Sequence, residues 1–182
     1  MPTDTSEKGL ERLICTALAG HPCDPPQPGK TREEPQPYGG AGWRGGDPKD
    51  YDRDYCLDLR QLKTFLRTTQ PDLAESLDLD NDSPTRRKFL ARLQGEISKR
   101  GTIDVLRQGL KHGAADLELF YGTPSPHNAK AKERYRQNRF TVSRQVHYSR
   151  DQSQRSLDLV LLINGLPVIT CELKNNLTKQ TV

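Results

Sequence analysis

Residues 157–182 have the sequence LDLVLLINGLPVITCELKNNLTKQTV, which decides the fold of this chain. Two apolar runs stand on either side of Asn164-Gly165, and this dipeptide between apolar runs is typical of a β-hairpin. Asp158 opens the first run, and Glu172 and Lys174 close the second. Because strand side chains alternate between two faces, Glu172 and Lys174 point the same way. Charges in an apolar hairpin are costly unless they pair or bind a metal.

Two carboxylates and a lysine on adjoining strands indicate a metal-dependent active site. Mg²⁺ is a hard cation that prefers oxygen ligands, so Asp158 and Glu172 are candidate ligands. Lys174 beside the ion would position a water or stabilise a developing negative charge. The alternative interpretation is an ordinary strand with surface charges.

The loop of the hairpin tests the metal hypothesis, because its length sets which residues face each other. A two-residue loop, Asn164-Gly165, places Asp158 opposite Cys171. A three-residue loop that includes Leu166 places Asp158 opposite Glu172. The metal hypothesis therefore predicts the three-residue loop, with the glycine in the left-handed region that it accepts without strain.

These residues resemble a known family. Asp158 followed by Glu172-Leu173-Lys174 is similar to the D…ExK signature of the PD-(D/E)xK nuclease superfamily. The longer string NRFTVSRQVHYS (138–149), together with 157–182, resembles the R (restriction) subunit of type I restriction enzymes. Residues 57–71 and 101–113 also resemble the amino-terminal region of that subunit. The resemblance covers nearly the whole chain and is weakest over 22–48.

The resemblance implies a fold and a set of site residues. The fold is an α/β nuclease-like core (α+β order), with a mixed central sheet of about four strands flanked by helices and incomplete at the carboxyl end. Asp158, Glu172 and Lys174 would be catalytic. The Mg²⁺ ligands would be Asp158, Glu172, the carbonyl of Leu173 and a helix glutamate, for which Glu7 and Glu11 are both candidates. We favour Glu11, although either could instead be an acid that favours the helix amino terminus.

The implied function is the endonuclease subunit of a type I restriction-modification system, which cuts double-stranded DNA. Its partners would be methyltransferase and specificity subunits, and ATP would act through a motor domain beyond this chain. We therefore expect the chain to be a fragment that is weak or inactive alone. The alternative is a non-catalytic DNA-binding or subunit-docking fragment of the same subunit.

Composition sets broader limits. The 182 residues are 32% hydrophobic and carry a formal net charge of +4, which permits nucleic-acid binding without requiring it. The sequence shows neither a signal peptide nor an apolar run of transmembrane length, so we expect a cytoplasmic protein without membrane contact.

We divide the chain into an amino-terminal helix (1–21), a Pro/Gly-rich loop or insertion (22–48), and a helical segment followed by the nuclease sheet (49–182). Apolar spacing predicts a helix over 6–19, capped by Ser6 or Thr5. Further helices are expected at 58–68, 83–100 and 102–113. Strands are expected at 116–122 and 139–149, and with the hairpin they would form a four-strand meander.

Two other features suggest contacts. Trp43, in the middle of the Pro/Gly-rich segment, is expected to pin it to the surface of the core. Residues 130–150 hold seven Lys or Arg and one acid, with aromatic residues between them. This segment is either a phosphate-tracking surface or a solvated linker and strand edge. Because strand residues alternate, we expect one of Arg144 and Gln145 to face the active-site cleft.

Overall fold

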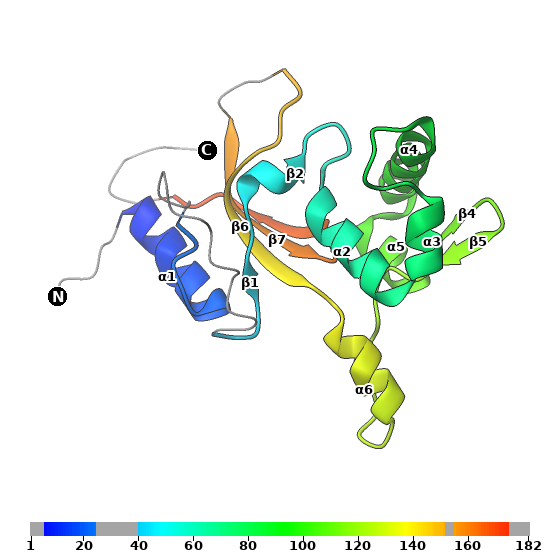
Figure 1. Ribbon diagram of the computed structural model, residues 1–182. Coiled ribbons are helices and arrows are strands. Elements are labelled where there is room, and N and C mark those ends of the chain that lie inside the picture. Colours follow the sequence, from blue (N-terminus) through cyan, green and yellow to red (C-terminus); the bar gives the residue numbers. More distant parts are fainter. Residues whose placement is uncertain (1–5, 25–39, 152–154, 175–182) are drawn as a thin grey trace.

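The computed structural model describes residues 6–24, 40–151 and 155–174. Figure 1 shows a central sheet with α1 on one side and the helices α2 to α5 on the other, while α6 projects away from both. The helices are α1 (Glu7–Ala19), α2 (Leu59–Thr69), α3 (Pro71–Ser76), α4 (Pro84–Arg100), α5 (Thr102–Gln108) and α6 (Ala129–Arg136), with a 3₁₀ turn at Pro48–Asp50. The strands are β1 (Arg44–Gly45), β2 (Tyr51–Asp52), β3 (Leu57–Asp58), β4 (Leu110–His112), β5 (Ala115–Leu117), β6 (Phe140–His147), β7 (Ser156–Ile163) and β8 (Leu166–Cys171).

The predicted mixed sheet of four strands flanked by helices is confirmed. Its order is β1–β6–β7–β8, with β1 parallel to β6 and the other neighbours antiparallel. The predicted meander is wrong in its first strand, because β5 pairs with β4 in a separate two-stranded sheet. The first strand is instead the two-residue β1, which lies in the Pro/Gly-rich segment 22–48. Residues 25–39 of that segment are outside the described residues, as are residues 175–182.

Side-chain caps fix the starts of the long helices, as the sequence predicted. Ser6, Asp58 and Ser83 each accept a hydrogen bond from a backbone N–H in the first turn of α1, α2 and α4. The helix expected over 102–113 ends earlier, at Gln108, because Gly109 takes a positive φ and leads into β4. The short helices α3 and α6 were not predicted.

The hairpin reaches the predicted pairing by a different route. Its loop has two residues, since Ile163 pairs with Leu166, and Asn164 and Gly165 both have positive φ. The predicted three-residue loop is therefore wrong. A β-bulge at Val168 supplies the missing one-residue shift, so that Leu159 pairs with Cys171. The ladder ends at this pair, and the next two residues in the same register are Asp158 and Glu172, the latter just beyond the end of β8.

The turn of the hairpin is buried against the helical side of the molecule. Asn164 is fully buried, and its side chain bonds Arg139 N, the Leu119 carbonyl and Asn138 Oδ1. A Cβ on Gly165 would lie 2.4 Å from the Asp58 carbonyl oxygen, so only glycine fits this turn. The turn thus joins the sheet to α2.

Separate apolar clusters cover the sheet. The largest lies among α2 to α5 and includes Phe65, Phe89 and Leu166. Under α1, Cys15 and Ala19 pack on Val142 and Leu159. The buried face of α1 is Gly9, Glu11, Cys15 and Ala19, whereas Leu10 and Leu13 of the predicted apolar stripe are exposed. The rotation of the helix therefore turns a glutamate toward the sheet.

Candidate functional site

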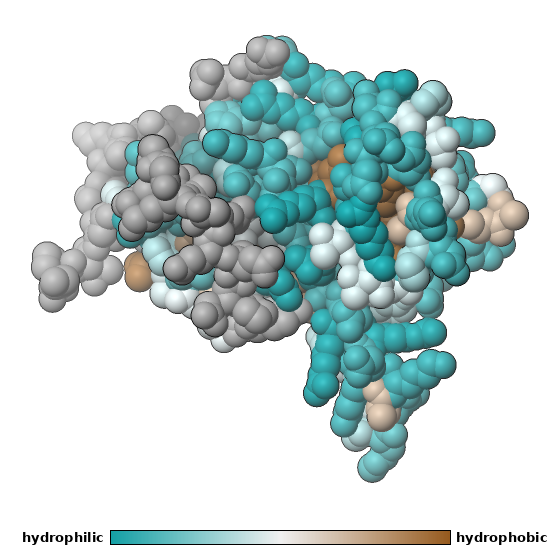
Figure 2. Space-filling model, in the orientation of Figure 1, coloured by the Kyte–Doolittle hydropathy of each residue, from teal (hydrophilic) through white to brown (hydrophobic). Residues whose placement is uncertain are grey.

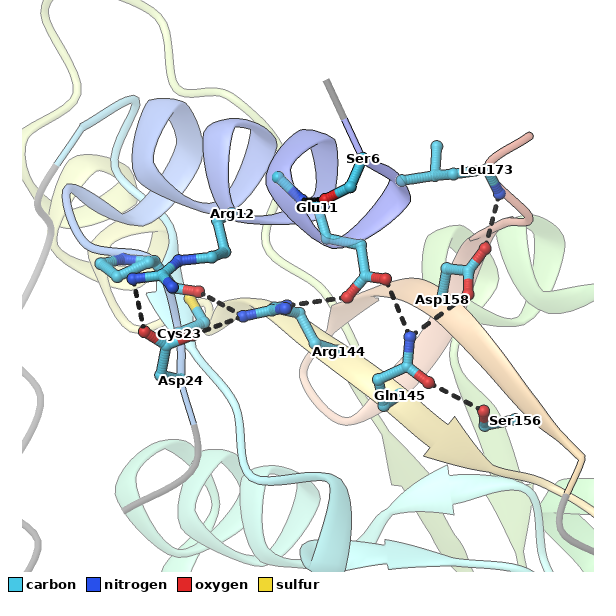
Figure 3. A network of polar contacts seen from close by, with 12 residues as sticks. Ser6, Glu11, Arg12, Cys23, Asp24, Arg144, Gln145, Ser156, Asp158 and Leu173 are labelled. Carbon is cyan, nitrogen blue, oxygen red and sulfur yellow. Dashed lines mark hydrogen bonds and ion pairs between the residues drawn. The ribbon is translucent and has the colours of Figure 1, made fainter. Parts of the chain in front are cut away.

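Asp158, on β7, is held from β6 and from the segment that follows β8. Its Oδ1 accepts a hydrogen bond from Gln145 Nε2 on β6 at 3.2 Å, and its Oδ2 accepts one from the backbone N–H of Leu173 at 2.6 Å. Figure 3 shows the carboxylate between these two donors. These two hydrogen bonds therefore fix the orientation of Asp158, the first residue of the D…ExK signature.

Glu11 reaches the same place from α1. Its side chain is almost fully buried, and its Oε1 accepts from Gln145 Nε2 at 2.9 Å. Its Oε2 accepts from Arg144 Nε at 3.0 Å (Figure 3). The single amide nitrogen of Gln145 thus donates to both Glu11 and Asp158. Two carboxylates that lie far apart in the sequence are brought together by one side chain.

The backbone of Gln145 explains how this is possible. Its φ is 52°, in the left-handed region that residues with a side chain rarely adopt. This kink brings both Arg144 and Gln145 to Glu11, and the expectation that only one of them faces the cleft is therefore wrong. It also turns Val146 away from α1, into the cluster with Val160 and Leu162.

Ser156 completes the setting of Gln145. Its hydroxyl donates to Gln145 Oε1 at 3.0 Å, which leaves the amide nitrogen directed at the carboxylates. Sequence reasoning missed this residue, because a serine at the start of a strand carries no distinguishing signal.

Arg144 fastens α1 and the segment after it to β6. Its guanidinium also donates to the Pro22 carbonyl at 3.0 Å and to Asp24 Oδ1 at 2.8 Å. Burial alone lowers the pKa of Arg144, but hydrogen bonds to Glu11 and Asp24 outweigh it and raise the pKa above its usual value. Asp24 also pairs with Arg12 at 3.0 Å. Sequence reasoning missed Asp24, which lies in irregular structure.

The three residues that follow β8 are Glu172, Leu173 and Lys174. The side chains of Glu172 and Lys174 are exposed, and Leu173 between them is half-buried. Its backbone, rather than the flanking side chains, contacts Asp158. Glu7 is half-buried in the first turn of α1 and is a less direct candidate than Glu11. Within residues 6–24, 40–151 and 155–174, no three His, Cys, Asp or Glu side chains lie close enough to hold a metal.

The chemistry of the donor set nevertheless fits a hard cation. Glu11 and Asp158 offer carboxylate oxygens that meet at one shared donor, and carboxylates are the ligands that Mg²⁺ prefers. The N–H groups of Gln145 place partial positive charge between Glu11 and Asp158, where two carboxylates would otherwise repel each other. The space between Glu11 on α1 and Asp158 on β7 is therefore favourable for a positive charge.

Comparison with known proteins adds the decisive observation. Residues 41–182 match the family described as the type I restriction enzyme R protein N terminus. The chain belongs to this family. Neither the curated proteins nor the solved structures contain a match.

Family membership gives the site a context. This is the amino-terminal region of a type I restriction R subunit, and a nuclease role is consistent with it. The match includes Asp158, Glu172 and Lys174 but begins after α1, so the assignment of Glu11 rests on its contacts alone. In the part of the chain that the structure describes, no helix is long and apolar enough to cross a membrane.

Proposed function

We propose that this chain carries the Mg²⁺-dependent nuclease centre of a type I restriction R subunit, which cleaves phosphodiester bonds of double-stranded DNA. The observation that supports this most directly is the shared hydrogen-bond donor of Glu11 and Asp158. It brings a helix acid to the D…ExK strands of a chain that belongs to a restriction-enzyme family.

The residues would divide the work by their chemistry. Asp158, Glu172, Glu11 and the carbonyl of Leu173 would hold Mg²⁺. When bound, the ion would neutralise the scissile phosphate and lower the pKa of an attacking water. Lys174, a compact cation on a flexible stem, would orient that water and offset the developing negative charge. Gln145 would release the carboxylates when the ion takes its place.

The family suggests the wider activity. In the complete restriction system, methyltransferase and specificity subunits would select the DNA, and an ATP-driven motor would translocate it. The nuclease centre would then need only to contact phosphates, which carry no sequence information directly. The protein would act in the cytoplasm, where it would encounter the DNA.

The test is cleavage by the assembled restriction enzyme that contains the full R subunit. Asp158→Ala and Glu172→Ala are expected to abolish DNA cleavage while ATP hydrolysis persists. Asp116→Ala, which changes an exposed acid in the distant β4–β5 hairpin, is the matched control and should leave both activities unchanged. Loss of ATP hydrolysis with cleavage would indicate an unfolded subunit, and normal cleavage by both variants would reject the proposal.

A non-catalytic DNA-binding or docking role is the second candidate. It is favoured by the exposure of Glu172 and Lys174 and by the absence of a three-ligand cluster among the described residues. Calorimetric titration of the chain with Mg²⁺ separates the two candidates. Binding that disappears in Asp158→Ala supports the nuclease centre, and no binding in either protein supports the docking role.

A further inference from the structure

An aromatic pocket lies at the opposite end of α1 from the acidic network. Its volume is about 540 Å³, within the range of roughly 300–1,000 Å³ typical of small-molecule sites. The residues that line it are Ala41, Gly42, Trp43, Tyr135, Arg136, Asn138 and Phe140. None of these residues belongs to the candidate nuclease site.

Sheet pairing assembles the three rings. Trp43 directly precedes β1, and the pairing of Arg44 with Thr141 sets Trp43 beside Phe140. The ring centroids of Trp43 and Phe140 are 5.6 Å apart, and those of Tyr135 and Phe140 are 6.2 Å apart. Trp43 therefore contacts β6 through Phe140, while residues 25–39 of its segment lie outside the described residues. The open space of the pocket lies beside these rings.

The charge around the pocket limits what it can bind. Helix α6 carries Lys130, Lys132, Arg134 and Arg136 against a single acid, and it buries no residue. Figure 2 shows this projecting helix as a mostly hydrophilic surface. Aromatic boxes commonly bind cations, but the surrounding positive charge opposes a cationic ligand. A planar ring that carries negative phosphate satisfies both the aromatic walls and the basic rim.

The pocket also lies on the face of the sheet that holds the acidic network. Phe140 and Val142 point to the same side of β6, and Val142 packs under α1. The backbone N–H of Trp43 donates to the Leu18 carbonyl near the end of α1. Glu11 lies earlier in the same helix, roughly 10 Å away along its axis at about 1.5 Å per residue. One DNA strand can therefore reach both places.

We propose that the pocket formed by Trp43, Tyr135 and Phe140 binds an unstacked base of single-stranded DNA, with the adjacent phosphates bound by α6. The proposal rests on the chain acting on DNA and names a strand-binding site that cleavage alone does not require. The base stacks on the rings without sequence preference, because every base has an aromatic face.

Trp43 reports directly on occupancy, because it is the only tryptophan in the chain. The test titrates the chain, without Mg²⁺ and with EDTA, with an oligothymidine of about 12 nucleotides, a length suited to single-strand grooves. Stacking should quench the indole fluorescence. An abasic oligomer of the same length keeps the phosphates and should bind weakly without quenching. A blunt duplex, whose bases are stacked, should not quench either.

Variants separate the rings from the charges. Tyr135→Ala should weaken oligothymidine binding roughly 5- to 100-fold, the range seen for single base–aromatic stacks. Tyr148→Ala removes an exposed aromatic ring beyond the other end of β6 and should have no effect. Lys130→Ala should keep the quenching at low salt and reduce the slope of log affinity against log salt by about one. Circular dichroism verifies that each variant is folded.

Several results would overturn the proposal. Equal quenching by the abasic oligomer or the duplex would show that no base enters the pocket. Full affinity in Tyr135→Ala would also show that no base enters the pocket. The absence of a fluorescence response to any oligomer would reject DNA as the ligand and favour an apolar side chain of a protein partner. Oligothymidine should still quench the fluorescence of Asp158→Ala, because this variant keeps the pocket. The base-binding proposal can therefore fail while the nuclease assignment stands, and the nuclease assignment can fail while base binding stands.

Discussion

The backbone N–H of Leu173 donates to Asp158 Oδ2 over 2.6 Å, which ties the ExK residues to β7. The Asp158 carboxylate is therefore oriented by the fold before any ion binds. Hydrogen bonds to charged groups contribute about 1.5–3 kcal/mol each.

This bond separates the structural role of Asp158 from its catalytic role. Asp158→Asn keeps an oxygen acceptor for Leu173, and Asp158→Ala does not. We expect both variants to lose cleavage, and we expect the alanine variant to be less stable than the asparagine variant by about 1 kcal/mol. Urea unfolding of the chain measures the difference. Equal stabilities would mean that the Leu173 bond does not contribute.

Lys174 should be less replaceable than its charge suggests. Arginine keeps the positive charge but presents a planar fork instead of a compact ammonium group. We expect Lys174→Arg to lose most cleavage in the assembled enzyme and Lys174→Ala to lose at least as much. A near-normal rate in the arginine variant would show that the position supplies only positive potential.

Gln145 combines a strained backbone with a bridging amide. Both Gln145→Gly and Gln145→Ala remove the donor shared by Glu11 and Asp158, but only glycine adopts the positive φ freely. We expect the glycine variant to be more stable than the alanine variant by about 1 kcal/mol. We also expect Mg²⁺ to raise the melting temperature more in the glycine variant than in the parent, because no amide must be displaced. Thermal unfolding with and without Mg²⁺ tests both statements.

The ion pair of Arg144 with Glu11 is almost enclosed, with side-chain exposures of 11% and 2%. Arg144→Met leaves a buried carboxylate without its cation, which typically costs about 3–5 kcal/mol. The double variant Arg144→Met with Glu11→Gln removes both charges and should recover a large part of that loss. Denaturant unfolding of the parent, both single variants (Arg144→Met and Glu11→Gln) and the double variant completes the cycle. Additive losses would show that the two side chains are not coupled.

Asp58 gives the stability of the chain a pH dependence. Burial raises its pKa to about 7, despite the Gln61 N–H that it caps. Because the folded pKa exceeds the unfolded value of about 3.9, protonation favours the folded state. This contribution is complete below about pH 4 and is lost as the pH rises through about 7.

The substitution Asp58→Asn should remove this dependence, since asparagine caps a helix as well as aspartate does. The variant should exceed the parent in stability above neutral pH, by at most on the order of 4 kcal/mol. Urea unfolding of the parent and of the variant at about pH 5 and about pH 8 gives the change in unfolding free energy with pH for each protein. If the variant and the parent had the same change in stability between these two pH values, a group other than Asp58 would be responsible for the pH dependence.

Local sequence patterns predicted the parts of the fold that depend on neighbouring residues. Ser6, Asp58 and Ser83 marked helix starts, and the two apolar runs around Asn164-Gly165 marked the hairpin. The patterns missed β1, because a two-residue strand exists only through its pairing with β6. The same reason explains why 116–122 was assigned to the wrong sheet.

The candidate site likewise has a part that the sequence predicted and a part that it did not. Asp158 and the ExK residues were visible as charges within apolar strands, and Glu11 was one of two helix candidates. The contact between them depends on the left-handed φ of Gln145, which is a glutamine in an otherwise regular strand. No local propensity predicts that conformation, and long-range packing of Val142 and Val146 on opposite clusters maintains it.

The bulge at Val168 gives the signature one residue of length tolerance. The chain between the turn and Glu172 is one residue longer than the ladder needs, and the bulge absorbs the surplus. A relative, or a deletion variant, that lacks Val168 would keep every other cross-strand pair and would still align Asp158 with Glu172. We therefore expect the interval between the aspartate and the glutamate to tolerate a change of one residue, and a search that fixes this interval would overlook such relatives.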